Sequence, residues 1–161
     1  MAGQRSFTVA IVCLLIFAVA SIVSRPKSAS GATLPLLGGA HVPPAVMGIV
    51  DRACRDCHSE ATRYPWYSYI APTSFLIGHD VNEGREHLNL SRWDKLSSVR
   101  RQRALSEIAN QVNDREMPLP IYTVLHPGAK LSKSDIDTLF EWTQTEKVRL
   151  ITESAGTIQA P

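Results

Sequence analysis

Two cysteines and a histidine that lie close together carry the clearest chemistry in this sequence. Cys54 and Cys57 are three residues apart, and His58 follows the second cysteine directly. Side chains at positions i and i+3 of a helical turn lie side by side, so both thiols and the imidazole would be neighbours. Such a C-x-x-C-H run could hold a zinc ion, close a redox-active disulfide or attach a c-type haem.

The zinc and disulfide alternatives need partners that the sequence does not supply. A structural zinc site takes four ligands, commonly two C-x-x-C pairs or one such pair with two spaced histidines. The chain has only three cysteines, and Cys13 lies far from the motif. A redox pair of the thioredoxin type accompanies a βαβ pattern, which is absent here. The motif therefore predicts one covalently attached haem c, with thioethers from Cys54 and Cys57 and with His58 as the proximal iron ligand.

A methionine in the second half of the chain is the predicted distal ligand. Met47 lies on the same short predicted helix as Cys54 and cannot reach the opposite haem face, whereas Met117 begins a proline-rich loop. Pro118 fixes the backbone beside Met117 and would hold a weak thioether ligand in place. His/Met ligation raises the potential and suits electron transfer, whereas an open distal face allows ligand binding or catalysis. Bis-histidine ligation would lower the potential; its candidates are His41, His79, His87 and His126.

The surroundings of the haem can be predicted less directly. A metal-bound histidine usually donates its second ring N–H to a carbonyl or carboxylate, and we expect carbonyls of the loop that contains Pro65 and Pro72 to accept it from His58. Three aromatic residues could line the haem or donate to a propionate: Trp66, Tyr67 and Trp93.

An apolar run at the start of the chain indicates export. Residues 7–23 carry no charge and are followed by Arg25, so we predict that residues 1–24 form a signal peptide or a membrane anchor. Ala18-Val19-Ala20 is a possible cleavage site, but we favour a retained anchor that tethers a periplasmic, or otherwise extracytoplasmic, domain to the inner membrane. The net charge of +2 is too small for a nucleic-acid-binding protein.

The remaining pattern predicts an all-α protein. We expect a flexible linker over residues 25–43, a haem-binding domain over residues 44–150 and a disordered tail over residues 151–161. Helical spacing of apolar residues indicates helices from Pro44 to the C-x-x-C-H motif, over 73–88, over 97–115 and from Ser132 onward. The stretches 63–72 and 117–131 contain several prolines and are expected to be ordered loops around a ligand.

The order of these motifs resembles the bacterial haem-binding domain family, a branch of the c-type cytochromes, over roughly residues 45–145. The resemblance implies a cytochrome c-like fold around one haem, with the domain's first and last helices packed together and with His58 and Met117 as axial ligands. Glu116 departs from the glycine expected before the methionine. The matching elements are Cys54-Arg-Asp-Cys57-His58-Ser59, Thr62, Pro65-Trp66-Tyr67-Ser68, Ile70-Ala71-Pro72, Asp80-Val81, Gly84-Arg85, Leu88-Asn89, Ser91, Trp93, Met117-Pro118, Tyr122, His126-Pro127 and Leu131-Ser132.

The function predicted from these features is transfer of single electrons to and from redox protein partners, without catalysis by the chain itself. The alternative is a haem-based sensor whose distal ligand is displaced by a small molecule. A peroxidase-like enzyme would need a proton-transferring distal group such as His79. Arg100, Arg101 and Arg103 could form a docking patch for an acidic redox partner.

Overall fold

The computed structural model describes residues 2–26 and 35–158, and every regular element in these ranges is helical. The 3-10 helices are η1 (Trp66–Tyr69), η2 (Leu90–Lys95) and η3 (Pro127–Ala129). The predicted all-α fold with a hydrophobic N-terminal helix is confirmed. The α-helices are α1 (Ala2–Val23), α2 (Pro44–Ala53), α3 (Arg55–His58), α4 (Thr73–His87), α5 (Ser98–Asn113), α6 (Pro120–Leu125) and α7 (Lys133–Ile158).

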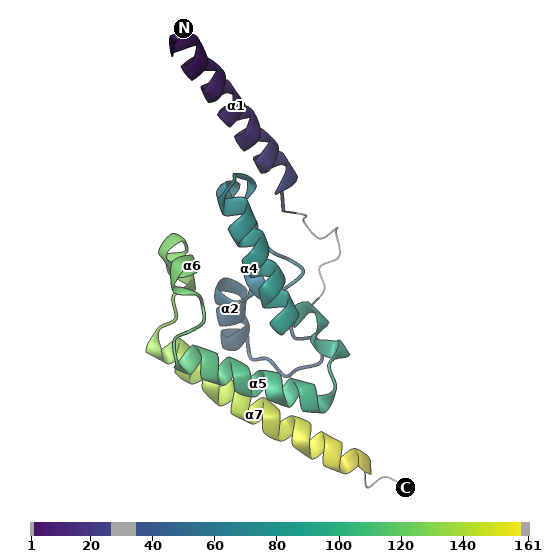
Figure 1. The fold of residues 1–161 in the computed structure, drawn as a ribbon. Coiled ribbons are helices and arrows are strands. Elements are labelled where there is room, and N and C mark those ends of the chain that lie inside the picture. The colour runs from purple at the N-terminus through teal and green to yellow at the C-terminus, as the bar shows by residue number, and fades with distance from the viewer. Residues whose placement is uncertain (1, 27–34, 159–161) are drawn as a thin grey trace.

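The core of the domain lies around the antiparallel pair α5 and α7, which run side by side in Figure 1. Leu105 and Val112 on α5 and Leu139 on α7 are buried there. Helix α2 also packs against α7, as the family resemblance implied for the domain's first and last helices. Val99 on α5 and Phe140 on α7 fit the helical spacing of apolar residues in the sequence but are exposed, so the buried stripe of each helix is narrower than that spacing suggests.

The boundaries predicted for the linker and the tail need correction. Residues 35–43 are not a free linker, because Leu37 is buried in the core and its N–H donates to the Leu90 carbonyl at 2.8 Å. Residues 27–34 of the predicted linker lie outside the described residues. Residues 151–158 of the predicted tail belong to α7, and 159–161 are not described. The packed domain therefore begins before Pro44, and its last helix continues beyond residue 150.

An ion pair on α7 between the buried Glu146 and the partly exposed Arg149 holds the segment before α2 in place. The Glu146 side chain is only 1% exposed and accepts a hydrogen bond from Arg149 Nε at 2.8 Å. It also accepts one from the His41 amide at 3.3 Å, while the Trp142 indole N–H donates to the His41 carbonyl at 2.8 Å. These contacts join α7 to a segment about 100 residues earlier in the chain.

Replacing Arg149 with methionine is expected to destabilise the domain by about 3–5 kcal/mol, because it leaves the Glu146 carboxylate buried without its charge partner. Urea unfolding of the intact protein measures the change. The matched control is Glu153→Gln, which removes the other carboxylate bound by Arg149. Glu153 is exposed, so its loss should cost less than about 1 kcal/mol. Equal effects of the two variants would contradict the role given to Glu146.

Helix α7 begins with a reciprocal cap between Ser132 and Asp135, which are three residues apart. The Ser132 amide and hydroxyl donate to Asp135 Oδ2 at 2.8 and 2.7 Å, and the Asp135 amide donates to Ser132 Oγ at 3.1 Å. Arg52 of α2 pairs with the other carboxylate oxygen at 2.7 Å. Burial raises the pKa of Asp135, but the hydrogen bonds from Arg52 and Ser132 outweigh burial and lower the pKa below its ordinary value of 3.8.

Asp135→Asn is therefore expected to lose about 1 kcal/mol of stability at pH 7. Because the folded state lowers this pKa, the carboxylate's contribution is complete above the ordinary value and is lost as the pH falls through the folded value. The difference in unfolding free energy between the two proteins should thus be constant near neutrality and shrink below pH 3.8. Urea titrations at several pH values measure it, with Asp137→Asn on the same helix as an exposed control. A difference that is independent of pH would contradict the assignment.

Candidate haem site

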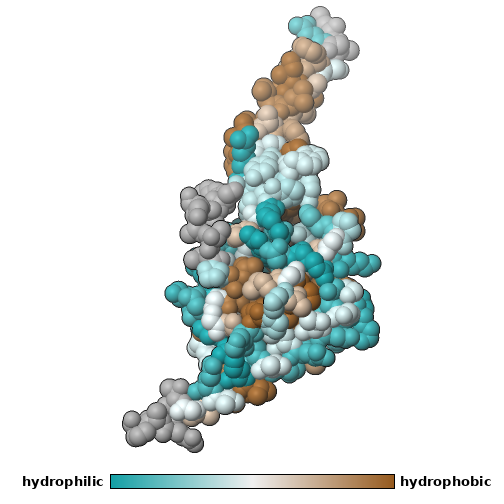
Figure 2. Space-filling view, turned by 180° about the vertical axis from the view of Figure 1, so that it is seen from behind, coloured by the Kyte–Doolittle hydropathy of each residue, from teal (hydrophilic) through white to brown (hydrophobic). Residues whose placement is uncertain are grey.

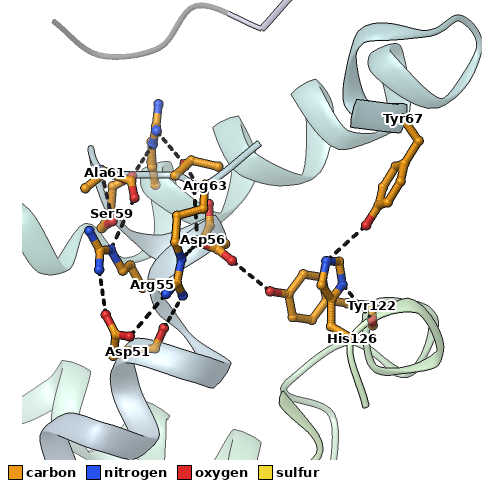
Figure 3. Close-up of polar contacts among 11 residues, drawn as sticks. Asp51, Arg55, Asp56, Ser59, Ala61, Arg63, Tyr67, Tyr122 and His126 are labelled. Carbon is orange, nitrogen blue, oxygen red and sulfur yellow. Dashed lines mark hydrogen bonds and ion pairs between the residues drawn. The ribbon is translucent and has the colours of Figure 1, made fainter. Parts of the chain in front are cut away.

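The C-x-x-C-H motif occupies its own short helix instead of ending the preceding one. Helix α2 stops at Ala53, the chain turns at Cys54 with φ −119° and ψ −36°, and α3 then spans Arg55–His58. Arg55 and Asp56, which lie between the two cysteines, hold this helix in place by contacts with residues outside the motif. Arg55 donates to Asp51 on α2 at 2.6 Å, and Asp56 accepts from the Arg63 Nε at 3.0 Å (Figure 3). The arginine and aspartate of the motif therefore hold the helix that carries the thiols and the imidazole.

His58 is oriented by two backbone carbonyls at the end of α4. Its Nδ1 lies 2.9 Å from the Gly84 oxygen and 3.0 Å from the Leu88 oxygen. Carbonyl oxygens only accept, so Nδ1 carries the hydrogen and Nε2 keeps its lone pair for a metal. The expectation that the loop containing Pro65 and Pro72 supplies these carbonyls was wrong, because the accepting oxygens belong to Gly84 and Leu88 at the end of α4, which packs against α3.

Gly84 permits this contact because it has no side chain. A Cβ atom at Gly84 would lie 2.9 Å from the Cys57 carbonyl oxygen and 3.3 Å from the Cys57 Cβ. Arg85 adds to the same junction by donating to the Ser59 carbonyl at 2.8 Å and to the Thr62 hydroxyl at 2.9 Å. Helix α4 therefore approaches the motif closely enough for its last carbonyls to reach His58.

Cys54, Cys57 and His58 form part of the wall of a mostly apolar cavity of about 390 Å³. Its volume falls within the range of small-molecule and cofactor sites. Burial raises the pKa of the Cys54 thiol to about 12 and that of the Cys57 thiol to about 11, so both are neutral at pH 7. The other lining residues are Leu37, Val50, Ala53, Asp80, Glu83, Gly84, His87, Leu88, Leu90, Ala104, Glu107, Ile108, Gln111, Val112, Met117, Pro118, Leu119, Tyr122, Leu131, Leu139 and Trp142.

Met117 lines the same cavity and is positioned by the end of α5. Arg115 adopts a left-handed conformation with φ 59°, and its amide donates to the Val112 carbonyl. The amides of Glu116 and Met117 both donate to the Gln111 carbonyl, at 3.0 and 3.1 Å. This pattern is a Schellman motif, which terminates a helix and fixes the direction of the following chain. The structure therefore brings together the four residues predicted as covalent and axial haem ligands.

A hydrogen-bond network joins the motif to the segment after Met117 (Figure 3). The Tyr122 hydroxyl donates to Asp56 Oδ2 at 2.9 Å, and the ring of Tyr122 stacks on His126 with centroids 4.1 Å apart. His126 Nδ1 donates to the Tyr122 carbonyl, so its Nε2 accepts from the Tyr67 hydroxyl at 3.0 Å. Burial, followed by the nearby Asp56 carboxylate, raises the pKa of Tyr122 and keeps its hydroxyl a donor.

The three aromatic residues predicted to line the haem lie away from the cavity in this structure. Trp66 is exposed, Tyr67 bonds to His126, and Trp93 is buried in the core; none of the three lines the cavity. Their contact with a haem stays a prediction. Trp93 alone has a feature that fits it, since its indole N–H is buried without a partner among the described residues.

Of the four histidines considered as alternative axial ligands, one lines the cavity. His79 and His87 are both largely exposed, and their Nε2 atoms lie 3.3 and 4.0 Å from the Glu83 carboxylate; of the two, only His87 also lines the cavity. Neither His41 nor His126 lines the cavity. No feature of the sequence favours His87 as a ligand, because both α4 histidines occur in a helix with a weak apolar pattern.

The residues present fit a haem better than a zinc ion. Across residues 2–26 and 35–158, no group of three or more His, Cys, Asp or Glu side chains could hold a metal ion. A flat apolar group bound beside His58 would instead use the cavity, the neutral thiols and the free imidazole nitrogen together.

Comparison with known proteins agrees with this chemistry. Neither the curated proteins nor the solved structures gave a match. A family model described as the haem-binding domain matches residues 12–145, which is most of the chain and includes the motif, the cavity residues and Met117. The chain therefore belongs to the haem-binding domain family.

Proposed function

We propose that this protein is an exported monohaem c-type cytochrome that carries single electrons. In this proposal Cys54 and Cys57 attach the haem through thioether bonds, His58 is the proximal ligand and Met117 is the distal ligand. The haem supplies a reversible one-electron change at its iron, and the chain sets the potential through ligands, burial and nearby charge.

The observation that carries the proposal is the orientation of His58. Its Nδ1–H is held by the Gly84 and Leu88 carbonyls, and two neutral thiols lie beside it on the wall of an apolar cavity. A hydrogen-bonded Nδ1 fixes the ring and makes the other nitrogen a stronger ligand. This arrangement resembles the second-coordination shell of a bound metal and has no evident purpose in a histidine that merely packs.

The remaining groups have supporting roles. The Schellman motif at the end of α5 holds the backbone of Met117 through the Gln111 carbonyl, so little conformational freedom is lost when the sulfur binds. Asp80, Glu83 and Glu107 give the cavity wall an acidic part, which would stabilise the oxidised, more positive form and lower the potential. Tyr122 connects this region to Asp56 inside the motif.

The proposal places the domain outside the cytoplasm, tethered by α1. Residues Ser6–Val23 are long and apolar enough to span a membrane, although a signal sequence has the same properties. Redox proteins are the expected partners. Of the three arginines considered for docking, Arg100 and Arg103 are exposed, whereas Arg101 donates to the carbonyls of Trp93 and Asp94.

Mass spectrometry of the denatured protein tests covalent attachment. The chain is expressed in a host with haem-attachment machinery, and one haem should remain bound after denaturation. Cys57→Ala and Cys54→Ala should each retain at most one thioether bond, and the double variant should lose all haem on denaturation. Cys13→Ala is the matched control and should behave like the natural chain. An unmodified mass, with another cytochrome correctly matured in the same host, would overturn the proposal.

A further inference from the structure

An uncharged surface at the base of α1 is not used by the proposed haem site. It comprises Trp66, Tyr69, Ile70, Phe75 and Leu76, which we call the aromatic face. Trp66 is 75% exposed, and Phe75 and Leu76 are each more than half exposed. The stretch 64–79, which contains the whole face, has no Asp, Glu, Lys or Arg. Such a concentration of exposed apolar and aromatic side chains indicates contact with another apolar phase.

Specific hydrogen bonds attach the aromatic face to the C-terminal end of α1. The hydroxyls of Ser24 and Ser74 are hydrogen-bonded at 2.5 Å, and the Ala71 amide donates to the Ser21 hydroxyl at 3.2 Å. Ser74 and Ala71 are buried in this junction. Figure 1 shows α1 projecting away from the domain at the end where α4 begins, and η1 packs against α4 at the same place.

Phe75 marks the depth of this surface relative to α1. It lines one hollow together with Leu15, Ile16, Val19, Ala20 and Val23 of that helix. With a rise of about 1.5 Å per residue, Leu15 and Val19 lie roughly 6–12 Å before the apolar span ends at Val23. If α1 crosses a bilayer, Phe75 is therefore at the depth of the outermost acyl chains and not in water.

The composition of the aromatic face suits the boundary between lipid and water. Trp and Tyr concentrate at membrane interfaces because each ring is apolar and carries one polar group. Arg25, one residue after the hydrogen-bonded Ser24, is exposed at the same level and can reach lipid phosphates. In Figure 2 the brown α1 continues into a pale region, the colour of residues with intermediate hydropathy, before the teal surface of the domain.

We propose that the aromatic face lies in the headgroup region of the bilayer that α1 spans, so that the haem domain is seated on the membrane in a fixed orientation. This inference rests on the anchoring role of α1 in the proposed function. The family match itself begins at residue 12, inside α1, which supports retention of the helix as part of the protein. The lipid bilayer is chosen over a second copy of the chain because the face is continuous with α1, whose described side chains from residue 6 to 20 are almost all exposed.

Spin labels on the full-length, haem-loaded protein in phosphatidylethanolamine–phosphatidylglycerol vesicles test the proposal. The native Cys13 gives the depth of α1, since Cys54 and Cys57 are consumed by the haem. Trp66→Cys and Phe75→Cys, each combined with Cys13→Ala, report on the aromatic face. Lys95→Cys in the same background is the control at an exposed polar position. Collision rates with oxygen and with a water-soluble nickel chelate are compared; relaxation caused by the haem iron cancels in the difference.

Labels at positions 66 and 75 should collide preferentially with oxygen, several-fold more than the label at position 95. A label at Cys13 in lipid, with labels at positions 66 and 75 as accessible to nickel as position 95, would overturn the seating and leave the anchor intact. Low accessibility to both reagents together with spin–spin broadening would assign the face to a second copy and also overturn it. A missing leader, or a Cys13 label in water, would remove the anchor and the inference with it.

Discussion

Replacing Gly84 with alanine is expected to destabilise the haem-loaded protein by about 1–3 kcal/mol, the usual cost of overpacking a tight contact. The added Cβ would lie 2.9 Å from the Cys57 carbonyl oxygen. Neither atom can move by rotation about a side-chain bond, because the backbone fixes the positions of both. Helix α4 would have to move from α3. That movement would also lengthen the hydrogen bonds from His58 Nδ1 to the Gly84 and Leu88 carbonyls.

The same substitution should raise the reduction potential. A hydrogen bond from Nδ1 to a carbonyl makes the imidazole a better electron donor, which favours the oxidised iron. Weakening this bond removes part of that preference. Equilibrium unfolding in guanidinium and spectroelectrochemical titration of the Soret band measure the two effects on one sample.

Gly78 provides a matched control on the same helix. A Cβ atom at Gly78 would meet nothing within 4 Å, so Gly78→Ala removes a helix-interior glycine without a clash. It should stabilise the protein by up to about 1 kcal/mol and leave the potential unchanged. If the Gly84 and Gly78 variants have the same stability and potential, the close approach of α4 does not set the geometry of His58.

The spacing of the motif predicts Cys54, Cys57 and His58 as haem ligands, but the groups that orient His58 lie 26 and 30 residues later. Backbone carbonyls leave no mark in a sequence, and only the tertiary contact of α3 with α4 brings them close. Gly84 stood in the sequence as part of the Gly84-Arg85 element of the family resemblance, with no structural role assigned to it. Its effect depends on what lies opposite its missing side chain, which no local pattern reveals.

Proline and glycine misled the prediction in two segments. Leu37 is buried although Pro35, Gly38 and Gly39 lie close to it in the sequence, and it has φ 55°. The glycine-rich composition therefore described the turn correctly but not its packing. Pro120 and Pro127 stand at the first positions of α6 and η3, where a missing N–H costs nothing. In both segments the prolines and glycines shape a short ordered element. In the first segment the apolar Leu37 was a better indicator of burial than the glycines beside it.

Replacing Met117 with leucine should convert a six-coordinate haem into one with an open distal position. Leucine has nearly the same volume and is apolar, so the cavity wall is conserved while the sulfur ligand is lost. Axial ligands set haem potentials over a range of about 0.8 V, and loss of the thioether, which favours reduced iron, should lower the potential by about 0.1 V or more. The reduced variant should also bind carbon monoxide, which a firmly six-coordinate haem does not.

Two further variants test whether the changes in potential and in carbon monoxide binding come from loss of the iron ligand. Met47→Leu changes a methionine on α2 that does not line the cavity, and it should leave the spectrum and potential unchanged. Met117→His should restore six-coordination, keep carbon monoxide out and lower the potential further, because a second imidazole favours oxidised iron. If the natural protein already binds carbon monoxide readily and Met117→Leu changes nothing, Met117 is not a firm ligand. The same cavity would then belong to a haem-based sensor whose distal side stays open, and His87, the other histidine on its wall, would be the next residue to replace.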